Sequence, residues 1–300
     1  MKKLLTAVLA VAFALVANAQ LVEPLSTQRV QLPEGVASEQ TTLSPDGSYA
    51  VVGVMGGSTL TRVDIATGES HLITSNGLAS SVMIAPDGQN IVFNSVSYNN
   101  RHLRMTSLRS VNVATGREIE LVKPSRRLNA GFALSNAGVT AIENGKARVR
   151  AFGSAKAQSM PVASINYGHL DITINGKTKT LDPQGRGSYL WPSVSPDGTK
   201  VVYCLSGAGT FVCNIDGSNV RSLGYLHAAR WMGNDMVVGM ADYDNGEQIL
   251  SSTIIVSDLN GTRQALTNDS QIAIFPSASA DGKRIAYSTL AGELFIINLK

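Results

Sequence analysis

The stretch Ser195-Pro196-Asp197-Gly198, within Trp191 to Leu205 (WPSVSPDGTKVVYCL), decides the fold. A short apolar run enters a polar turn and leaves it as a second apolar run. In such a turn proline presets φ, aspartate bonds its own backbone and glycine accepts a positive φ. The stretch therefore predicts two antiparallel strands joined by a tight turn.

The same pattern recurs along the chain. Aligned on the third turn residue, its six copies are 41, 50, 60, 37 and 47 residues apart. A period of this size is typical of a repeat architecture, in which each repeat is one supersecondary unit. The other copies are Ser44-Pro45-Asp46-Gly47, Ala85-Pro86-Asp87-Gly88, Ser279-Ala280-Asp281-Gly282 and two eroded ones, Ser135-Asn136-Ala137-Gly138 and Met232-Gly233-Asn234-Asp235.

Each unit contains further strands after the turn. A β-rich run such as 201–203 is followed by a third strand that ends in Asp or Asn and a glycine turn, as at 63–68. A more polar fourth strand follows, as at 118–121. Four antiparallel strands of falling apolarity describe one propeller blade. The six units predict an all-β, six-bladed β-propeller of four-stranded antiparallel blades.

The two ends of the chain predict how the ring closes. The last unit stops at its third strand, 294–300, whereas residues 28–32 form a strand without a unit of its own. Placing this N-terminal strand outermost in the last blade would remove two open sheet edges. We therefore expect one propeller domain over residues 20–300.

Residues 1–19 resemble a secretory signal peptide. Lys2 and Lys3 precede an apolar run, and Ala17-Asn18-Ala19 forms a small-residue cleavage site. The run is shorter than the ~20 residues that span a bilayer, so a membrane anchor is disfavoured. We expect a periplasmic or secreted protein with no transmembrane segment in the mature chain.

The repeats carry a family resemblance. The Ser-Pro-Asp-Gly turns, with Pro192 or Pro276 ahead and Tyr203 or Tyr287 behind, resemble the WD40-like PD40 repeats of TolB-type six-bladed propellers. The resemblance covers residues 28–300 and implies a TolB-like role in the envelope of a Gram-negative bacterium. Residues 20–35 are too few to hold the additional N-terminal α/β domain of TolB itself.

Cys204 and Cys213, the two cysteines of the chain, flank the turn at 207–209. If the turn is centred on Ala208-Gly209, they lie opposite each other and a disulfide can form in an oxidising compartment. A one-residue change of register leaves two free thiols on opposite faces.

The sequence contains no catalytic motif. It lacks Gly-x-Ser-x-Gly, and its four histidines have no second ligand at metal-binding spacing. The loop 242–247 lacks the glycine and glutamate positions of a calcium loop and favours a hairpin turn. We expect a non-enzymatic protein without metal or cofactor.

Charge is unevenly distributed. The formal charge of +3 falls to +1 without Lys2 and Lys3, so no nucleic-acid partner is expected. Residues 101–156 hold eleven bases and three acids, a balance of +8 that leaves −7 for the rest. The residues predicted to bind a partner are Arg101, Arg104, Lys123, Arg126, Arg127, Arg148, Arg150 and Trp191.

Blade topology predicts where these residues lie. Connections between strands two and three, and between blades, share the face opposite the Pro-Asp-Gly turns. The basic connections, including Lys146 and Lys156, should open there, together with Tyr98, Tyr189, Trp191, Tyr225, Tyr243 and Phe275. The third unit is 13 residues longer than the mean, which predicts an extra hairpin or mobile loop near 150–167.

The favoured function is a monomeric protein-interaction scaffold in the envelope, with an envelope protein or an anionic glycan as partner. A solvated basic rim without a partner would show the same charge pattern. The alternative function is a carbohydrate-active, glycan-binding or lyase-like propeller with a site at the channel mouth. Its site would combine acids with His227 and Tyr189.

Overall fold

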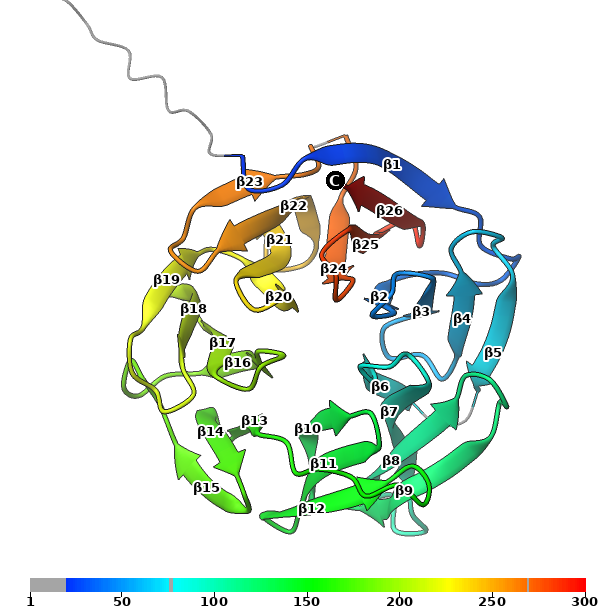
Figure 1. Cartoon of the computed structure of the whole chain (residues 1–300), viewed down its shortest axis with the longest axis vertical. Helices are drawn as coiled ribbons and strands as arrows, with labels where there is room; N and C mark the ends of the chain where they lie inside the picture. Colours follow the sequence, from blue (N-terminus) through cyan, green and yellow to red (C-terminus); the bar gives the residue numbers. More distant parts are fainter. Residues whose placement is uncertain (1–19, 76–77, 269) are drawn as a thin grey trace, which may run out of the picture.

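The computed structural model describes residues 20–75, 78–268 and 270–300, and every regular element in these ranges is a β-strand. The strands form seven sheets that stand around a central axis as the blades of a propeller (Figure 1). The predicted leader at 1–19 lies outside the described residues. No helix in the described ranges is long and apolar enough to cross a membrane.

We number the blades 1 to 7 along the chain. Blade 1 contains β2 (Gln40–Leu43), β3 (Tyr49–Gly53), β4 (Leu60–Asp64) and β5 (Ser70–Thr74). Blade 2 contains β6 (Leu78–Ile84), β7 (Asn90–Tyr98), β8 (Arg104–Asn112) and β9 (Glu118–Ser125). Blade 3 contains β10 (Leu128–Ser135), β11 (Gly138–Glu143) and β12 (Lys146–Ala151). Blade 4 contains β13 (Val162–Asn166), β14 (His169–Ile174) and β15 (Lys177–Thr180).

The remaining three blades are all four-stranded. Blade 5 contains β16 (Tyr189–Val194), β17 (Lys200–Leu205), β18 (Gly209–Asn214) and β19 (Arg221–Gly224). Blade 6 contains β20 (His227–Met232), β21 (Met236–Asp244), β22 (Ile249–Asp258) and β23 (Arg263–Ala265). Blade 7 contains β24 (Ala273–Ala278), β25 (Arg284–Thr289), β26 (Leu294–Leu299) and the N-terminal strand β1 (Pro24–Val30).

The ring closes through the N-terminal strand, as predicted. β1 lies outermost in blade 7 and pairs antiparallel with β26, with Val30 opposite Leu294. The strand spans 24–30 rather than 28–32. The backbone N–H of Lys300 also donates to the carbonyl of Glu23 (3.0 Å), so the two ends of the described chain are bonded side by side.

The number of blades differs from the prediction: there are seven, not six. The long third unit contains two blades of three strands each, blades 3 and 4, rather than one blade with an extra hairpin or loop. The first hairpin of blade 4 turns at Asn166-Tyr167-Gly168-His169, which has neither proline nor aspartate. A count based on Pro-Asp-Gly turns therefore misses this blade.

The two short blades run in opposite directions. In blade 3, Ala151 lies opposite Gly138 and the N–H of Phe152 donates to Ala137 (2.9 Å), so the chain leaves on the side of the first turn. β13 then runs antiparallel to β10, since the Asn129 amide reaches the Ile165 carbonyl (3.4 Å). Because blade 3 has three strands, the chain leaves it on the side of the Pro-Asp-Gly turns and not on the opposite side, where the first strand of a blade usually begins. Blade 4 also has three strands, so the chain is back on that opposite side before β16.

Apolar side chains fill the spaces between neighbouring blades. The cluster between blades 1 and 2 contains Val51, Leu60 and Phe93, none more than 2% exposed. Comparable clusters join every other neighbouring pair except blades 3 and 4 among the described residues. There the two blades approach closely without such a cluster: a Cβ at Gly131 would lie 2.7 Å from the carbonyl of Ala163, and the Asn129 side-chain amide donates to the Ile165 carbonyl.

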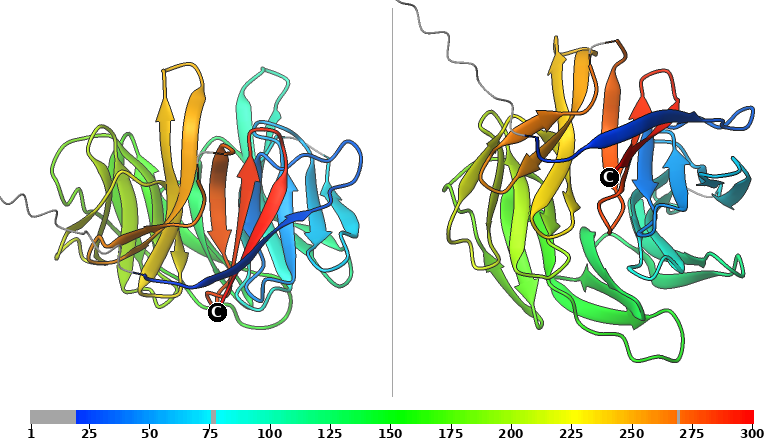
Figure 2. Two further views of the ribbon diagram at one scale, coloured as in Figure 1. Left: turned by 90° about the horizontal axis from the view of Figure 1, so that it is seen from above. Right: turned by 45° about the horizontal axis from the view of Figure 1, so that its top comes forward.

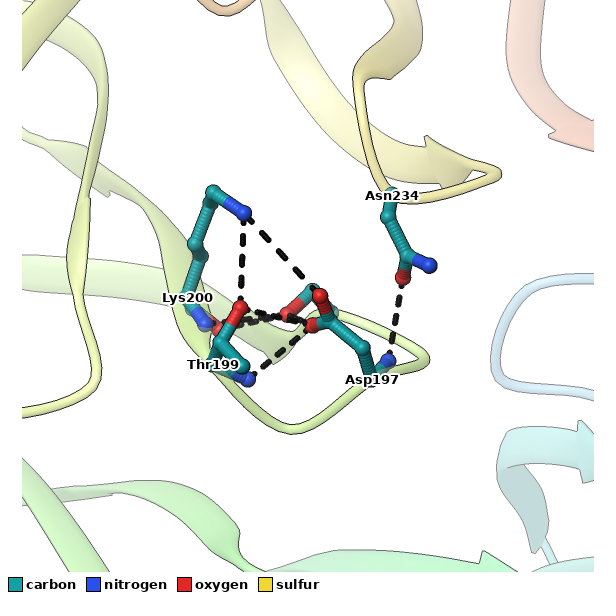
Figure 3. A network of polar contacts seen from close by, with 5 residues as sticks. Asp197, Thr199, Lys200 and Asn234 are labelled. Carbon is teal, nitrogen blue, oxygen red and sulfur yellow. Dashed lines mark hydrogen bonds and ion pairs between the residues drawn. The ribbon is translucent and has the colours of Figure 1, made fainter.

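Hydrogen bonds within the Ser-Pro-Asp-Gly turns explain why these residues recur (Figure 3). Asp197 Oδ1 accepts from Ser195 Oγ (2.6 Å), Thr199 N (3.0 Å) and Thr199 Oγ1 (2.8 Å). The Ser195 hydroxyl is the main cause that holds the pKa of Asp197 below its ordinary value. Asn234 of the next blade accepts from the backbone N–H of Asp197 (3.0 Å) and so joins two blades.

The two cysteines are free thiols. Cys204 lies opposite Thr210 and Cys213 lies opposite Val201, so the disulfide considered above is not formed. The hairpin turns at 206–208 instead of at Ala208-Gly209, which shifts the register by three residues. This odd shift places the two side chains on opposite faces of the blade.

The propeller has two different faces. We call the side with the Ser-Pro-Asp-Gly turns the turn face and the other side the hairpin face. Two long hairpins, β7–β8 and β21–β22, rise above the hairpin face, and Figure 2 (left) shows them side-on in teal and in yellow to orange.

Candidate interaction face and central cavity

The two projecting hairpins end in similar tips. Tyr98 and Tyr243 stand where each first strand ends, and they are 61% and 66% exposed. An asparagine side chain folds each tip: Asn99 Oδ1 accepts from the N–H of Arg101 (2.9 Å), and Asn245 Oδ1 from that of Glu247 (3.0 Å). Each tip is thus a locally ordered loop that presents an exposed tyrosine.

The tips carry opposite charges. Arg101 and Arg104 belong to the β7–β8 tip, whereas Asp244 and Glu247 belong to the β21–β22 tip, and all four are exposed. None of the four forms an ion pair in the described part of the chain. The hairpin face therefore presents a positive and a negative projection from blades 2 and 6.

Further predicted basic residues extend the positive region. Lys123, Arg126 and Arg127 lie exposed at the end of β9 and in the connection to β10. The carbonyl of Arg127 accepts from the N–H of Asn144 (2.9 Å), which holds this connection against the β11–β12 turn. We call Arg101, Arg104, Lys123, Arg126 and Arg127 the basic strip.

Three other basic residues do not belong to the strip. Arg148 is exposed on β12, the outermost strand of blade 3. Arg150 pairs with Glu143 (2.9 Å) and lies opposite Val139, near the turn face. Lys156 lies in segment 152–161, which starts on the turn face because blade 3 has an odd number of strands. The prediction that every basic connection opens on the hairpin face is thus wrong for this segment.

The predicted aromatic residues separate into an exposed group and a buried one. Trp191 (44% exposed) and Tyr225 (60% exposed) flank His227, with ring centroids 5.4 and 6.5 Å from the imidazole. His227 Nδ1 lies 2.8 Å from the buried carboxylate of Asp242. Tyr189, however, is fully buried.

Burial of Tyr189 has consequences for the channel-mouth site that the alternative function requires. Its hydroxyl donates to the carbonyl of Gly185 (3.0 Å) and accepts from the N–H of Gln184 (3.1 Å). Both hydrogen-bonding roles of the hydroxyl are thus taken by the backbone. The structure does not combine Tyr189 with His227 in one open site.

A cavity of about 220 Å³ lies on the propeller axis. Residues from the inner strands β2, β6, β16, β20 and β24 line it, among them Thr41, Ser81, Trp191, Arg230 and Phe275. Arg230 is the one charged side chain among the described lining residues. Its surface opens into the cavity, but protein surrounds the group, and this desolvation lowers the pKa of the guanidinium.

Arg230 is not among the predicted site residues, although its residue type is unusual for its position in the repeat. Counting back from the third turn residue, the equivalent positions hold Thr42, Met83, Ser193 and Ser277. An arginine in this series departs from the repeat at an inner-strand position.

Repeated bulges shape the wall of the cavity. Trp191, Ala228 and Phe275 have positive φ values of 48°, 49° and 49° at a register shift in their inner strands. A β-bulge re-aims side chains at such a position. Ser81 of β6 has the same feature (φ 52°, at a register shift), and all four residues line the cavity because the bulge recurs at the same place in four blades.

No group of three or more His, Cys, Asp or Glu side chains within the described ranges could hold a metal ion. The loop 242–247 forms the β21–β22 turn that the sequence favours, with Asn245 N donating to Gln248 O (3.2 Å).

Comparisons with known proteins support the architecture. No protein-family model matches the chain, and no curated protein matches it. A chain in the solved structure "Crystal Structure of Mitotic Checkpoint Complex" superimposes with a TM-score of 0.61 at 9% identity, over 99% of this chain and 98% of that chain. At this identity the likeness shows the fold alone. The protein is a seven-bladed β-propeller.

Proposed function

We propose that this propeller is a protein-interaction scaffold of the bacterial envelope and that it holds its partner on the hairpin face. One observation carries the proposal: two projections of opposite charge, each with an exposed tyrosine, rise from the same face of the ring. Tyrosine is enriched in protein interfaces because its ring is apolar and its hydroxyl forms hydrogen bonds. Loops on a rigid scaffold are the usual place for such contacts.

The charges favour a protein over an anionic glycan as the partner. A protein with an acidic patch opposite the basic strip and a basic patch opposite Asp244 and Glu247 complements both projections. A polyanion would contact the basic strip and be repelled by the acidic tip. Charged residues at the rim of an interface contribute mainly to association rate and specificity.

The envelope location and the TolB-like role rest on sequence features. The leader at 1–19 supports export, and the Ser-Pro-Asp-Gly turns support the family resemblance. The structural neighbour belongs to a structure named as a complex, which agrees with a role in protein assembly.

Affinity capture with charge-reversed variants tests the proposal. Residues 20–300 are immobilised and exposed to envelope extract at about 50 mM and 300 mM salt, since screening weakens exposed charge contacts. The test variant carries Arg104→Glu, Arg126→Glu and Arg127→Glu. The control variant carries three reversals of exposed residues near the turn face, Arg117→Glu, Lys156→Glu and Lys177→Glu.

We expect one partner to bind the wild type and the control, and to lose at least about tenfold in recovery with the test variant. A loss of this size corresponds to about 1.4 kcal/mol of binding free energy. Equal recovery with both variants would remove the hairpin face from the proposal. Separately, cell fractionation of the full chain that finds it in the cytosol would remove the envelope location.

A further inference from the structure

Arg230 is a cation without a partner at the centre of the ring. It lies on β20, and strands of five blades surround the cavity that it lines. Within the described residues, its guanidinium has no hydrogen bond or ion pair. The residue is exposed to the space of the cavity, so its guanidinium is accessible to a bound anion.

Polar residues lie beside Arg230 in the same cavity. The side chains of Gln40 and Ser81 line the same space and can also donate.

Charge, shape and size define the ligand chemistry. One guanidinium balances one negative charge, and its planar fork fits the two oxygens of a carboxylate. A doubly charged anion would leave one charge uncompensated in an enclosed space. The cavity, at about 220 Å³, is smaller than the ~300–1,000 Å³ of pockets for drug-sized ligands. Trp191 and Phe275 offer apolar surface for the carbon atoms next to the carboxylate.

We propose that the central cavity binds a carboxylate group, which Arg230 holds as its counter-ion. The carboxylate belongs to a small organic acid or to a peptide end that enters the channel. This site is separate from the partner surface on the hairpin face, so either proposal can fail alone.

Calorimetric titration of residues 20–300 tests the site with four probes. Propionate and benzoate carry the carboxylate, whereas propionamide and benzamide have the same shape without the charge. We expect the acids to bind with millimolar or better dissociation constants and the amides to bind at least tenfold more weakly. A short peptide with a free carboxyl end, compared with its amidated form, separates the peptide source from the small acid.

Variants identify the residues. Arg230→Gln should weaken acid binding at least tenfold, and Arg230→Lys should retain part of it. Arg117→Gln, near the turn face, is the matched control and should bind as the wild type does. Failure of every carboxylate to bind the wild type, or equal binding by Arg230→Gln, would overturn the proposal.

Stability provides an independent readout. Without ligand, Arg230→Met should leave Tm within about 2 °C of the wild type, because Arg230 is exposed to the cavity. With saturating benzoate the wild type should gain Tm and the variant should not, since the ligand stabilises only the wild type. A large fall in Tm for Arg230→Met without ligand would show that the arginine supports the fold, and would also overturn the proposal.

Discussion

The turn face and the hairpin face of this propeller differ in how far their residues recur from blade to blade and in how their polar groups are bonded. On the turn face the same residues recur and their polar atoms bond to each other, as in the Ser195–Asp197–Thr199 turn. On the hairpin face the residues differ from blade to blade, two tyrosines stand exposed, and the basic strip forms no ion pair with any residue that the structure describes. Recurrence in the sequence therefore marks residues that build the ring, and departure from it marks residues left free for a partner.

The largest effect should come from a turn glycine. Gly47 has φ +69°, and a Cβ there would lie 2.7 Å from Cδ of Arg284, whose guanidinium donates to the Gly47 carbonyl (2.7 Å). We expect Gly47→Val to lower the free energy of unfolding by about 3 kcal/mol, through backbone strain and the clash. Gly246→Val is the control on the hairpin face, with positive φ but no neighbour within 4 Å. Urea unfolding curves of equal midpoint for the two variants would contradict the comparison.

A smaller effect is expected from the turn aspartate. Asp197→Ala removes one acceptor for three hydrogen bonds and should cost about 1–2 kcal/mol, measured by urea unfolding. Glu247→Ala, at the tip of β21–β22, should change stability by less than about 0.5 kcal/mol. If the two substitutions cost the same, the turn bonds do not stabilise the ring.

The pH dependence of stability should also separate the faces. The folded pKa of Asp197 is below its unfolded value, so its contribution is present above the unfolded pKa, about 4, and is lost as pH falls through the folded pKa. Ser195→Ala removes the main cause of the lowered pKa. The variant should therefore differ from the wild type in Tm at pH 7 and differ less at pH 3. The corresponding difference in the free energy of unfolding should stay below about 1 kcal/mol because the carboxylate is partly exposed. A constant gap from pH 7 to pH 3 would contradict this assignment.

The smallest change in stability is expected at the hairpin tips. Tyr98→Ala and Tyr243→Ala should each alter the free energy of unfolding by about 0.5 kcal/mol or less, since both side chains are mostly exposed. The same variants should reduce capture of the partner. Strong destabilisation by either substitution would assign that tyrosine to the fold and not to an interface.

The sequence allowed the repeat architecture and the closing strand to be predicted. The conformation of a tight turn is set by its own residues, so a Ser-Pro-Asp-Gly turn can be recognised from the sequence. The strand at 28–32 was found because the last blade needed a fourth strand. The blade count failed because the first hairpin of blade 4 uses Tyr167-Gly168, a turn that shares no residue type with Pro-Asp-Gly except glycine.

The site was harder to predict because it depends on distant contacts. The basic strip lies where topology placed it, but Arg150 is paired with Glu143 and Tyr189 is buried between blades. Whether Cys204 and Cys213 lie opposite each other depends on the register of the hairpin, and the register changes when the turn shifts. The cavity around Arg230 is lined by five blades, and no local pattern reports which inner strands face one another.

The pairing of the two three-stranded blades limits how this ring can be resized. Removing blade 3 or blade 4 alone would bring the chain to β16 from the opposite side, and every later strand would have to reverse its direction. Removing both would preserve the direction and leave a five-bladed ring. For engineering by deletion or grafting, residues 128–180 therefore act as one cassette, whereas blades 1, 2, 5 and 6, each four-stranded and continuous in the chain, can be exchanged one at a time.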